Sequence, residues 1–173
     1  MREVHIYAET DTKAFESRER MVGYLLEVIL PNGKPATKAE FYQTTGTYNE
    51  VILDALVKAL ERMKEKCELH LHTHNTFVLG TIDGPNLSLW EKTGYRNAKG
   101  EKIKCAELWE RFAKGITGNL IATEAGSHSY YNWMITEMKR LKPEDPVEDP
   151  GKEIKIRIWD HRLVAPKHVE MRA

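Results

Sequence analysis

The chain has 173 residues, of which 41% are hydrophobic and 30% are charged, a balance that is typical of one folded domain and excludes an intrinsically disordered chain. Its 26 basic and 26 acidic residues give a net charge of zero, which excludes a global field that would attract nucleic acid or membranes. Any basic binding surface must therefore be local.

The first residues lead directly into a strand pattern, without the apolar region of a signal peptide. No apolar run is long enough to span a bilayer, so no membrane partner is expected. The two cysteines, Cys67 and Cys105, lie far apart and form no Cys-x-x-Cys pair. We therefore expect reduced thiols in a cytoplasmic protein.

Three antiparallel strands are expected at the start of the chain. Residues 4–9 form the first, and residues 21–30 form the second after a charged turn. The Asn-Gly pair at 32–33 is typical of a hairpin turn and leads to a third strand at 39–45.

A helix and a histidine-rich strand follow. Apolar residues at three- and four-residue spacing predict an amphipathic helix from 49 to about 66. Residues 68–74, Glu-Leu-His-Leu-His-Thr-His, then place three histidines on one side of a strand, with Asn75 as a helix N-cap. A strand–helix–strand unit makes its two strands parallel, so we expect His74 near Glu9.

The second half of the chain predicts further helices, one strand and a basic loop. The helices are expected at 77–82, 86–92, 106–114 and after 127–131, the strand at 120–123 and the polar, basic loop at 95–104.

The C-terminal part has a different composition. Residues 142–152 are rich in Pro, Asp and Glu and are interpreted as a linker. Isoleucines alternate over 154–159, which predicts a strand that adds to this domain's sheet or to another chain's. The expected organisation is a domain at 1–141, the linker, and a C-terminal strand extension at 153–173.

This order of elements resembles the ribonuclease H fold, and the local sequence resembles the bacterial, type 1 family. The resemblance implies an α/β fold with a five-stranded mixed sheet, three antiparallel strands followed by two parallel ones, flanked by helices and here extended by a C-terminal strand. It covers about residues 1–141. The similar segments are 4–7, 22–24, 47–49, 59–60, 107–109 and, most of all, 89–104, which resembles the family's basic protrusion.

The resemblance also implies an activity, cleavage of RNA in RNA–DNA hybrids by two metal ions that four acidic side chains hold. Read across, these positions fall on Glu9, Ile52, His74 and Ile135, and only Glu9 is acidic. Isoleucine binds no metal, and histidine suits Zn²⁺, Mn²⁺ or Fe²⁺ better than Mg²⁺. We therefore predict a divergent member that lacks the ordinary two-metal site. Mg²⁺ or Mn²⁺ is expected only if the family activity survives, and otherwise no cofactor.

Four other carboxylates lie within two residues of these positions and offer an alternative metal set: Asp11, Glu50, Asp54 and Glu137. Helical geometry opposes the middle pair. A two-residue step turns a helix by about 200°, while Ile52 itself belongs to the apolar stripe.

Three roles remain open for Glu9 and His74. They can form a hydrogen-bonded pair, an acid–base couple or a metal site. The loop residue His128 lies where the family carries a mobile histidine, and it would complete a His, His, Glu set. His72 points the same way one pleat deeper, and His5 lies further away.

Two groups of residues are candidates for nucleic-acid binding, which in the resembled family involves the hybrid backbone. Thr47 and Asn49 match backbone-contacting positions, although both also suit an ordinary helix start. In the basic loop, cations would meet phosphates and Tyr95 would supply an aromatic surface, although Glu91 and Glu101 interrupt the patch. The cations are Lys92, Arg96, Lys99, Lys102 and Lys104.

Three functions therefore stay open. The first is a nucleic-acid-binding domain without the ordinary hydrolase site, and the second is a hydrolase with an altered metal. The third is an interaction or assembly module that forms a homodimer or binds a partner protein through the C-terminal strand.

Overall fold

The computed structural model describes residues 1–142 and the backbone of residues 154–159. The predicted linker beyond Lys142 and the rest of the predicted C-terminal extension lie outside the described residues. None of the helices in the described part of the chain is long and apolar enough to cross a membrane.

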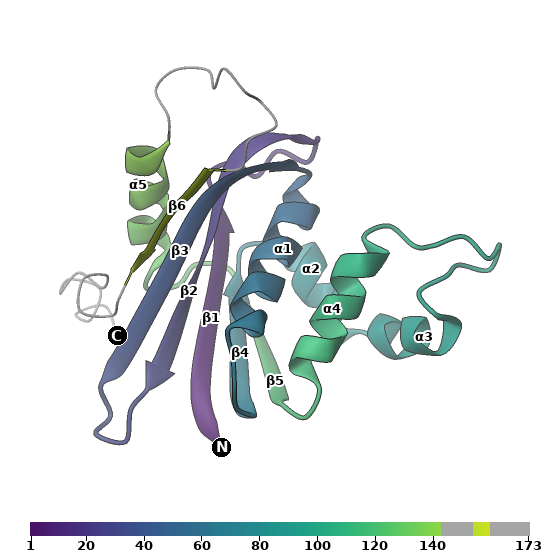
Figure 1. Cartoon of the computed structure of the whole chain (residues 1–173), viewed down its shortest axis with the longest axis horizontal. Coiled ribbons are helices and arrows are strands. Elements are labelled where there is room, and N and C mark those ends of the chain that lie inside the picture. Colours follow the sequence, from purple (N-terminus) through teal and green to yellow (C-terminus); the bar gives the residue numbers. More distant parts are fainter. Residues whose placement is uncertain (143–153, 160–173) are drawn as a thin grey trace.

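Six strands form one sheet in the order β5-β4-β1-β2-β3-β6 (Figure 1). Strands β1, β2 and β3 are antiparallel, and β4 pairs in parallel with both β1 and β5. The expected five-stranded mixed sheet is confirmed, and the C-terminal strand extends it by pairing antiparallel with β3. The strands are β1 (Arg2–Thr10), β2 (Arg18–Ile29), β3 (Pro35–Gly46), β4 (Cys67–Thr73), β5 (Leu120–Ala125) and β6 (Ile154–Trp159).

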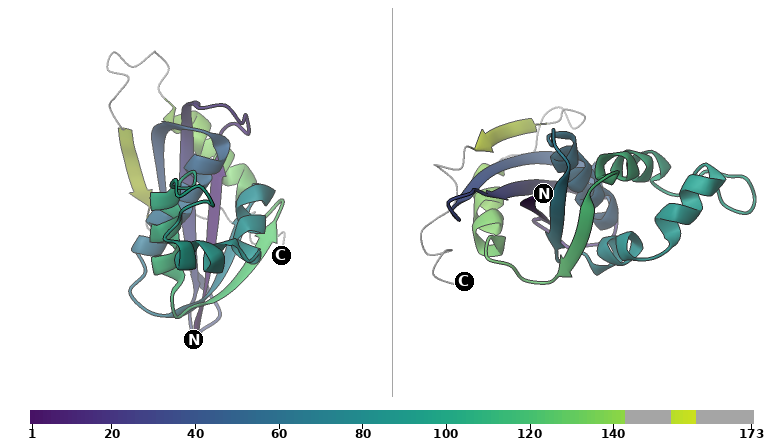
Figure 2. Two further views of the ribbon diagram at one scale, coloured as in Figure 1. Left: turned by 90° about the vertical axis from the view of Figure 1, so that its right-hand side faces the viewer. Right: turned by 90° about the horizontal axis from the view of Figure 1, so that it is seen from below.

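Five helices in the described part of the chain flank the sheet. Helix α1 packs on one face, with α4 beside it, whereas α5 packs on the other face (Figure 2). Helix α3 and the loop after it extend away from the sheet (Figure 1). The helices are α1 (Tyr48–Glu61), α2 (Thr76–Asp83), α3 (Asn86–Thr93), α4 (Ala106–Ile116) and α5 (Tyr131–Leu141).

Several boundaries differ from the sequence prediction, and the start of β2 and the end of α1 are two of them. Strand β2 begins at Arg18 rather than Met21, because the buried Arg20 side chain donates to the carbonyl oxygens of Thr12 and Glu16 and ties the charged turn to the strand. Helix α1 ends at Glu61, well before residue 66. The charged residues at 18–20 therefore led to a predicted start of β2 that is too late. The helical spacing of apolar residues led to a predicted end of α1 that is too late.

Helix starts are set by side-chain caps. Thr47 and Glu50 form a capping box at α1, in which the Thr47 hydroxyl accepts from the Glu50 amide at 3.2 Å. Asn75 caps α2 by accepting from the Val78 amide at 2.9 Å, as predicted. These caps fix the backbone directly beside the carboxyl ends of β1 and β4.

The two faces of the sheet are built from alternate residues of the same strands. In β1, Val4, Ile6 and Ala8 are fully buried in the core beneath α1. Tyr7 lies on the other face, in the smaller apolar cluster that α5 covers. The histidines of β1 and β4 share this second face because side chains alternate along a strand.

Candidate functional site

The candidate site lies where the parallel strands β1 and β4 end. Their register runs to the pair Tyr7 and His72, so the next residues on the same face are Glu9 and His74. His128 reaches the same corner from the loop between β5 and α5. Three residues that are distant in sequence thus meet at one edge of the sheet.

Glu9 is the centre of this cluster. Its Oε2 atom accepts from Nδ1 of His74 and from Nε2 of His128, each at 2.8 Å, and its Oε1 atom lies 3.4 Å from the His74 amide. Both imidazoles act as donors because a carboxylate has no proton to give. Since Glu9 is only 1% exposed, these charge-assisted bonds compensate a buried charge.

Aromatic side chains surround the cluster. The rings of His74 and Tyr131 lie 4.2 Å apart, and those of Tyr7 and His128 lie 4.7 Å apart. The buried Tyr48 hydroxyl and Nδ1 of His128 have no hydrogen-bond partner among the described residues. Burial, and then the charge of Glu9, raises the pKa of Tyr48, so Tyr48 stays protonated as a neutral donor.

The cluster has the chemistry of a possible metal site. One ligand atom from each of Glu9, His74 and His128 lies within 4.8 Å of the others. Two imidazoles and one carboxylate suit Zn²⁺, Mn²⁺ or Fe²⁺, whereas Mg²⁺ prefers an octahedral shell of oxygens. Ile52 is fully buried in the core beneath α1. Ile135 packs against the smaller apolar cluster that α5 covers. Neither position therefore offers an oxygen to a Mg²⁺ pair.

The four carboxylates that could have replaced the missing ones have other partners. None of them joins the group formed by Glu9, His74 and His128 among the described residues. Their partners are the Met21 amide for Asp11, the Thr47 amide for Glu50, the Tyr42 hydroxyl for Asp54 and the Arg140 guanidinium for Glu137.

Comparisons with known proteins identify the fold. No protein-family model matches the chain. It is 28% identical over 135 residues to a protein named ribonuclease H from Clostridium botulinum strain Hall, covering 76% of this chain and 89% of that protein. A ribonuclease H from Thermus thermophilus is 31% identical over 86 residues, 42% of this chain and 52% of that protein.

Comparison with solved structures gives the same fold. LC9-RNase H1, a type 1 RNase H with the type 2 active-site motif, superposes with a TM-score of 0.63 at 15% identity, over 90% of this chain and 78% of that one. The chain is a ribonuclease H-like protein. A foamy viral protease-reverse transcriptase in complex with dsDNA matches with a TM-score of 0.58 at 13% identity, over 80% of this chain and 92% of that one.

In this ribonuclease H-like protein, the start of α1 lies beside the basic loop. Asn49 and Lys104 line one cavity of about 320 Å³, together with Phe77 and Trp90. The Asn49 side-chain oxygen accepts from the Asn75 amide group at 2.8 Å, which holds it in place. Thr47 caps α1 and so performs the structural role that was its alternative interpretation. The two predicted groups of nucleic-acid residues thus adjoin.

The basic loop is ordered by its own contacts. The Arg96 guanidinium donates to the Gly100 carbonyl at 2.8 Å, and Arg96 and Lys102 form an isolated bridge between backbones. All five predicted cations are exposed: Lys92, Arg96, Lys99, Lys102 and Lys104.

The prediction that Tyr95 presents an aromatic surface to nucleic acid is wrong, because its side chain is buried. Tyr95 belongs to the larger apolar cluster and is only 9% exposed. Gly94 and Tyr95 both have positive φ, 66° and 61°, which turns the chain and directs the ring inward. Phe77, 63% exposed at the shared cavity, is the aromatic side chain that faces solvent there.

Sequence reasoning missed several residues around Glu9. The Tyr131 ring lies beside His74 in a tilted arrangement, and Lys13 Nζ lies 5.4 Å from the centre of the Tyr131 ring. The charge of Glu9 contributes to the raised pKa of the buried Tyr48. The only signal was proximity in sequence: Tyr131 is three residues from His128, and Tyr48 adjoins Asn49.

Proposed function

We propose that this ribonuclease H-like chain binds nucleic acid, an RNA–DNA hybrid or another duplex, through the start of α1 and the basic loop, and that it lacks the ordinary two-metal hydrolase site. The observation that carries this proposal is the cavity shared by Asn49 and Lys104. A foamy viral protease-reverse transcriptase of similar fold, with a TM-score of 0.51, was solved in complex with an RNA/DNA hybrid.

The charge of the surface supports the proposal. Five exposed cations on α3 and the loop outnumber the two acidic residues among them, Glu91 and Glu101. Cations of this kind bind phosphates and release counterions from the duplex. Asn49 supplies a polar contact and Phe77 an exposed ring for a sugar or base. Tyr95 is left out of the proposed surface because its ring is buried.

The donor set at Glu9 supports the loss of ordinary hydrolysis. The cluster holds one carboxylate, which two imidazole N–H groups already occupy. Ile52 has no carboxylate, and its position is fully buried in the apolar core, where an unpaired charge would be costly. A pair of Mg²⁺ ions would therefore lack the oxygen ligands that it requires.

Binding to an RNA–DNA hybrid at several salt concentrations tests the proposal. We expect affinity to fall steeply with salt, and the double variant Lys99→Ala/Lys104→Ala to reduce the slope of log K against log salt by about 2. Lys34→Ala/Lys38→Ala is the matched control, because these exposed lysines flank the hairpin between β2 and β3. Absence of binding by the wild type at low salt would reject the proposal.

A second candidate is a hydrolase with an altered metal. The observation that favours it is the mutual distance of at most 4.8 Å among ligand atoms of Glu9, His74 and His128. Hybrid cleavage should be assayed in Mg²⁺, Mn²⁺ and Zn²⁺ for the wild type, Glu9→Gln and His74→Ala. Activity that depends on both residues supports the candidate, and activity that persists in both variants contradicts it.

Assembly through the C-terminal strand remains a proposal of lower rank, as does a cytoplasmic location. In this structure β6 pairs with β3 of the same chain, so the strand has a place in its own sheet. Sizing of the full chain against one that ends after Leu141 tests whether a homodimer or a partner needs this strand. Equal monomeric behaviour and equal stability would exclude an assembly role.

A further inference from the structure

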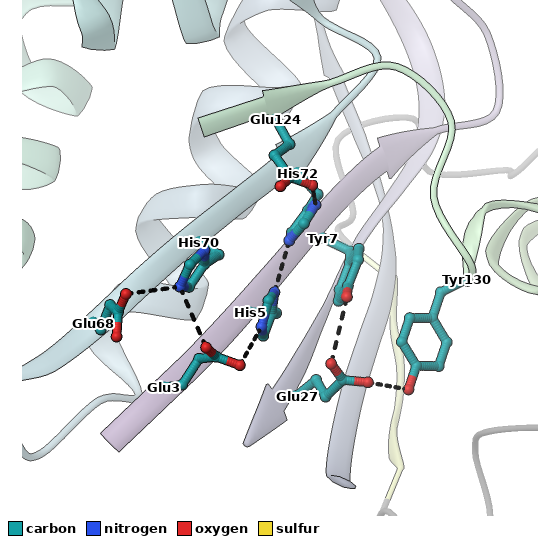
Figure 3. Close-up of polar contacts among 9 residues, drawn as sticks. All are labelled: Glu3, His5, Tyr7, Glu27, Glu68, His70, His72, Glu124 and Tyr130. Carbon is teal, nitrogen blue, oxygen red and sulfur yellow. Dashed lines mark hydrogen bonds and ion pairs between the residues drawn. The ribbon is translucent and has the colours of Figure 1, made fainter. Parts of the chain in front are cut away.

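Two short segments of identical pattern lie side by side on the sheet. Glu3-Val-His5 is in β1 and Glu68-Leu-His70 is in β4. The parallel register pairs Glu3 with Glu68 and His5 with His70. Residues two apart share a face and direct partners are neighbours, so the four side chains gather on one face (Figure 3).

The spacing of their polar atoms is that of a metal site. Nε2 of His5 lies 3.0 Å from Glu3, and Nε2 of His70 lies 3.8 Å from Glu3 and 3.4 Å from Glu68. Ligand atoms of Glu3, His5 and His70 lie within 4.8 Å of one another. Tetrahedral Zn²⁺ with bonds of about 2.0–2.1 Å separates its ligand atoms by about 3.3–3.4 Å, so only small rotations of exposed side chains are needed.

One ring nitrogen of the group makes no hydrogen bond within the part of the chain that the structure describes. Nε2 of His70 is buried, and the 3.4 Å approach of Glu68 is an ion-pair contact that does not complete a hydrogen bond. It faces both carboxylates (Figure 3). A buried polar atom without a partner calls for an explanation such as an ion, and a cation between the two glutamates would satisfy it.

The neighbouring residues suit metal binding by His5. Nδ1 of His5 lies 2.8 Å from Nε2 of His72, and Nδ1 of His72 lies 3.3 Å from Glu124 (Figure 3). With a metal on its Nε2 atom, His5 donates its Nδ1–H to His72, which donates its own Nδ1–H to Glu124. Such a relay fixes the tautomer of a ligating histidine, and here every ring nitrogen in it has a role.

Access and charge favour a borderline divalent cation. The side chains of Glu3 and Glu68 are 44% and 46% exposed, whereas those of His5 and His70 are 18% and 19% exposed. An ion can therefore enter from solvent and meet two preformed imidazoles. Two carboxylates balance a charge of +2, and imidazole selects Zn²⁺ over Mg²⁺ or Ca²⁺. We propose that Glu3, His5, Glu68 and His70 form a zinc site, separate from the Glu9 cluster.

Titration calorimetry of the full, untagged chain with ZnCl2 tests the proposal. We expect the wild type to bind Zn²⁺ with a micromolar or lower Kd, and His5→Gln/His70→Gln to weaken that binding at least 100-fold. The matched control is His74→Gln/His128→Gln, which removes the imidazoles of the other cluster. It should keep the site, as should His161→Gln/His168→Gln, which removes the two histidines nearest the C-terminus.

Two further measurements keep the test decisive if a variant folds poorly. Glu3→Gln changes only a half-exposed side chain and should weaken Zn²⁺ binding at least tenfold. Co²⁺ in place of Zn²⁺ should give the intense visible absorption of a four-coordinate site, which His5→Gln/His70→Gln abolishes. Absence of binding by the wild type at 100 μM Zn²⁺, or binding that only the His74 and His128 variant abolishes, would overturn the proposal.

Discussion

The two faces of the sheet are built from the same strands but differ in the side chains that they carry. On the α1 face, β1 contributes Val4, Ile6 and Ala8 to one continuous apolar core. On the α5 face, the intervening residues of β1 include His5 and Glu9, and apolar packing is confined to the part beneath α5. The rest of that face carries histidines with carboxylate partners.

This difference shows which face of the sheet can hold polar side chains that bind ligands. A face that helices cover completely excludes water, so a polar group there would need a full set of partners. The α5 face is covered only in part, so imidazoles can pair with half-exposed glutamates at its rim. We expect stability to depend mainly on the α1 face and ligand binding mainly on the α5 face.

The largest effect is expected from Ile52→Ala on the α1 face. Ile52 is fully buried, so its truncation leaves a cavity and should lower the free energy of unfolding by about 2–5 kcal/mol. His70→Ala on the other face should cost less than about 1 kcal/mol with a chelator present. Urea unfolding measures both variants, and similar losses would contradict the division between the faces.

A smaller loss is expected from Gly23→Ala, which adds a methyl group on the α5 face. A Cβ atom at Gly23 would lie 2.3 Å from a Phe41 ring carbon and 2.7 Å from the Glu40 carbonyl oxygen. The overlap should cost about 1–3 kcal/mol of unfolding free energy.

Gly80 provides the control, because it lies within α2 and a Cβ atom there has nothing within 4 Å. Gly80→Ala should raise stability by up to about 1 kcal/mol. Equal thermal shifts for the two alanine variants would show that the close packing at Gly23 is not limiting.

Glu9→Gln tests the polar part of the α5 face. The substitution removes the charge that two imidazole N–H groups share, and a hydrogen bond to a charged group contributes about 1.5–3 kcal/mol. We expect unfolding free energy to fall by about 2 kcal/mol. Glu110→Gln, on the exposed side of α4, should change it by less than about 0.5 kcal/mol. Equal effects would mean that the Glu9 bonds add nothing.

His72 should give this face a pH dependence. Burial, followed by the charges of His5, His128 and His70, lowers the pKa of His72 to about 3, whereas an unfolded histidine takes up its proton near pH 6.5. The resulting stability is present above pH 6.5 and is lost as pH falls towards 3, at no more than about 1.4 kcal/mol per pH unit. Urea unfolding at pH 7.0 and 5.5, with chelator, should show a smaller difference for His72→Gln.

Local patterns allowed much of this to be predicted. Alternation along residues 68–74 identified the histidine strand and its shared face, and Asn75 was predicted as the α2 cap. The order of elements was enough to predict the mixed sheet. The alternation and the cap depend on neighbours within a few residues, where period and capping are set by backbone geometry.

Other features needed the folded chain. The alignment of Glu3-Val-His5 with Glu68-Leu-His70 depends on the register between two strands that α1 separates in sequence. The burial of Tyr95 depends on a turn with positive φ, and the contact of His128 with Glu9 depends on where a loop returns.

The sequence by itself determined which side chains alternate, which residues cap helices and which positions carry donor atoms, because those properties are local. Only the tertiary structure decided which of these donors meet. Parallel pairing and loop closure bring together residues as far apart as Glu9 and His128, and no periodicity within a single segment encodes that distance.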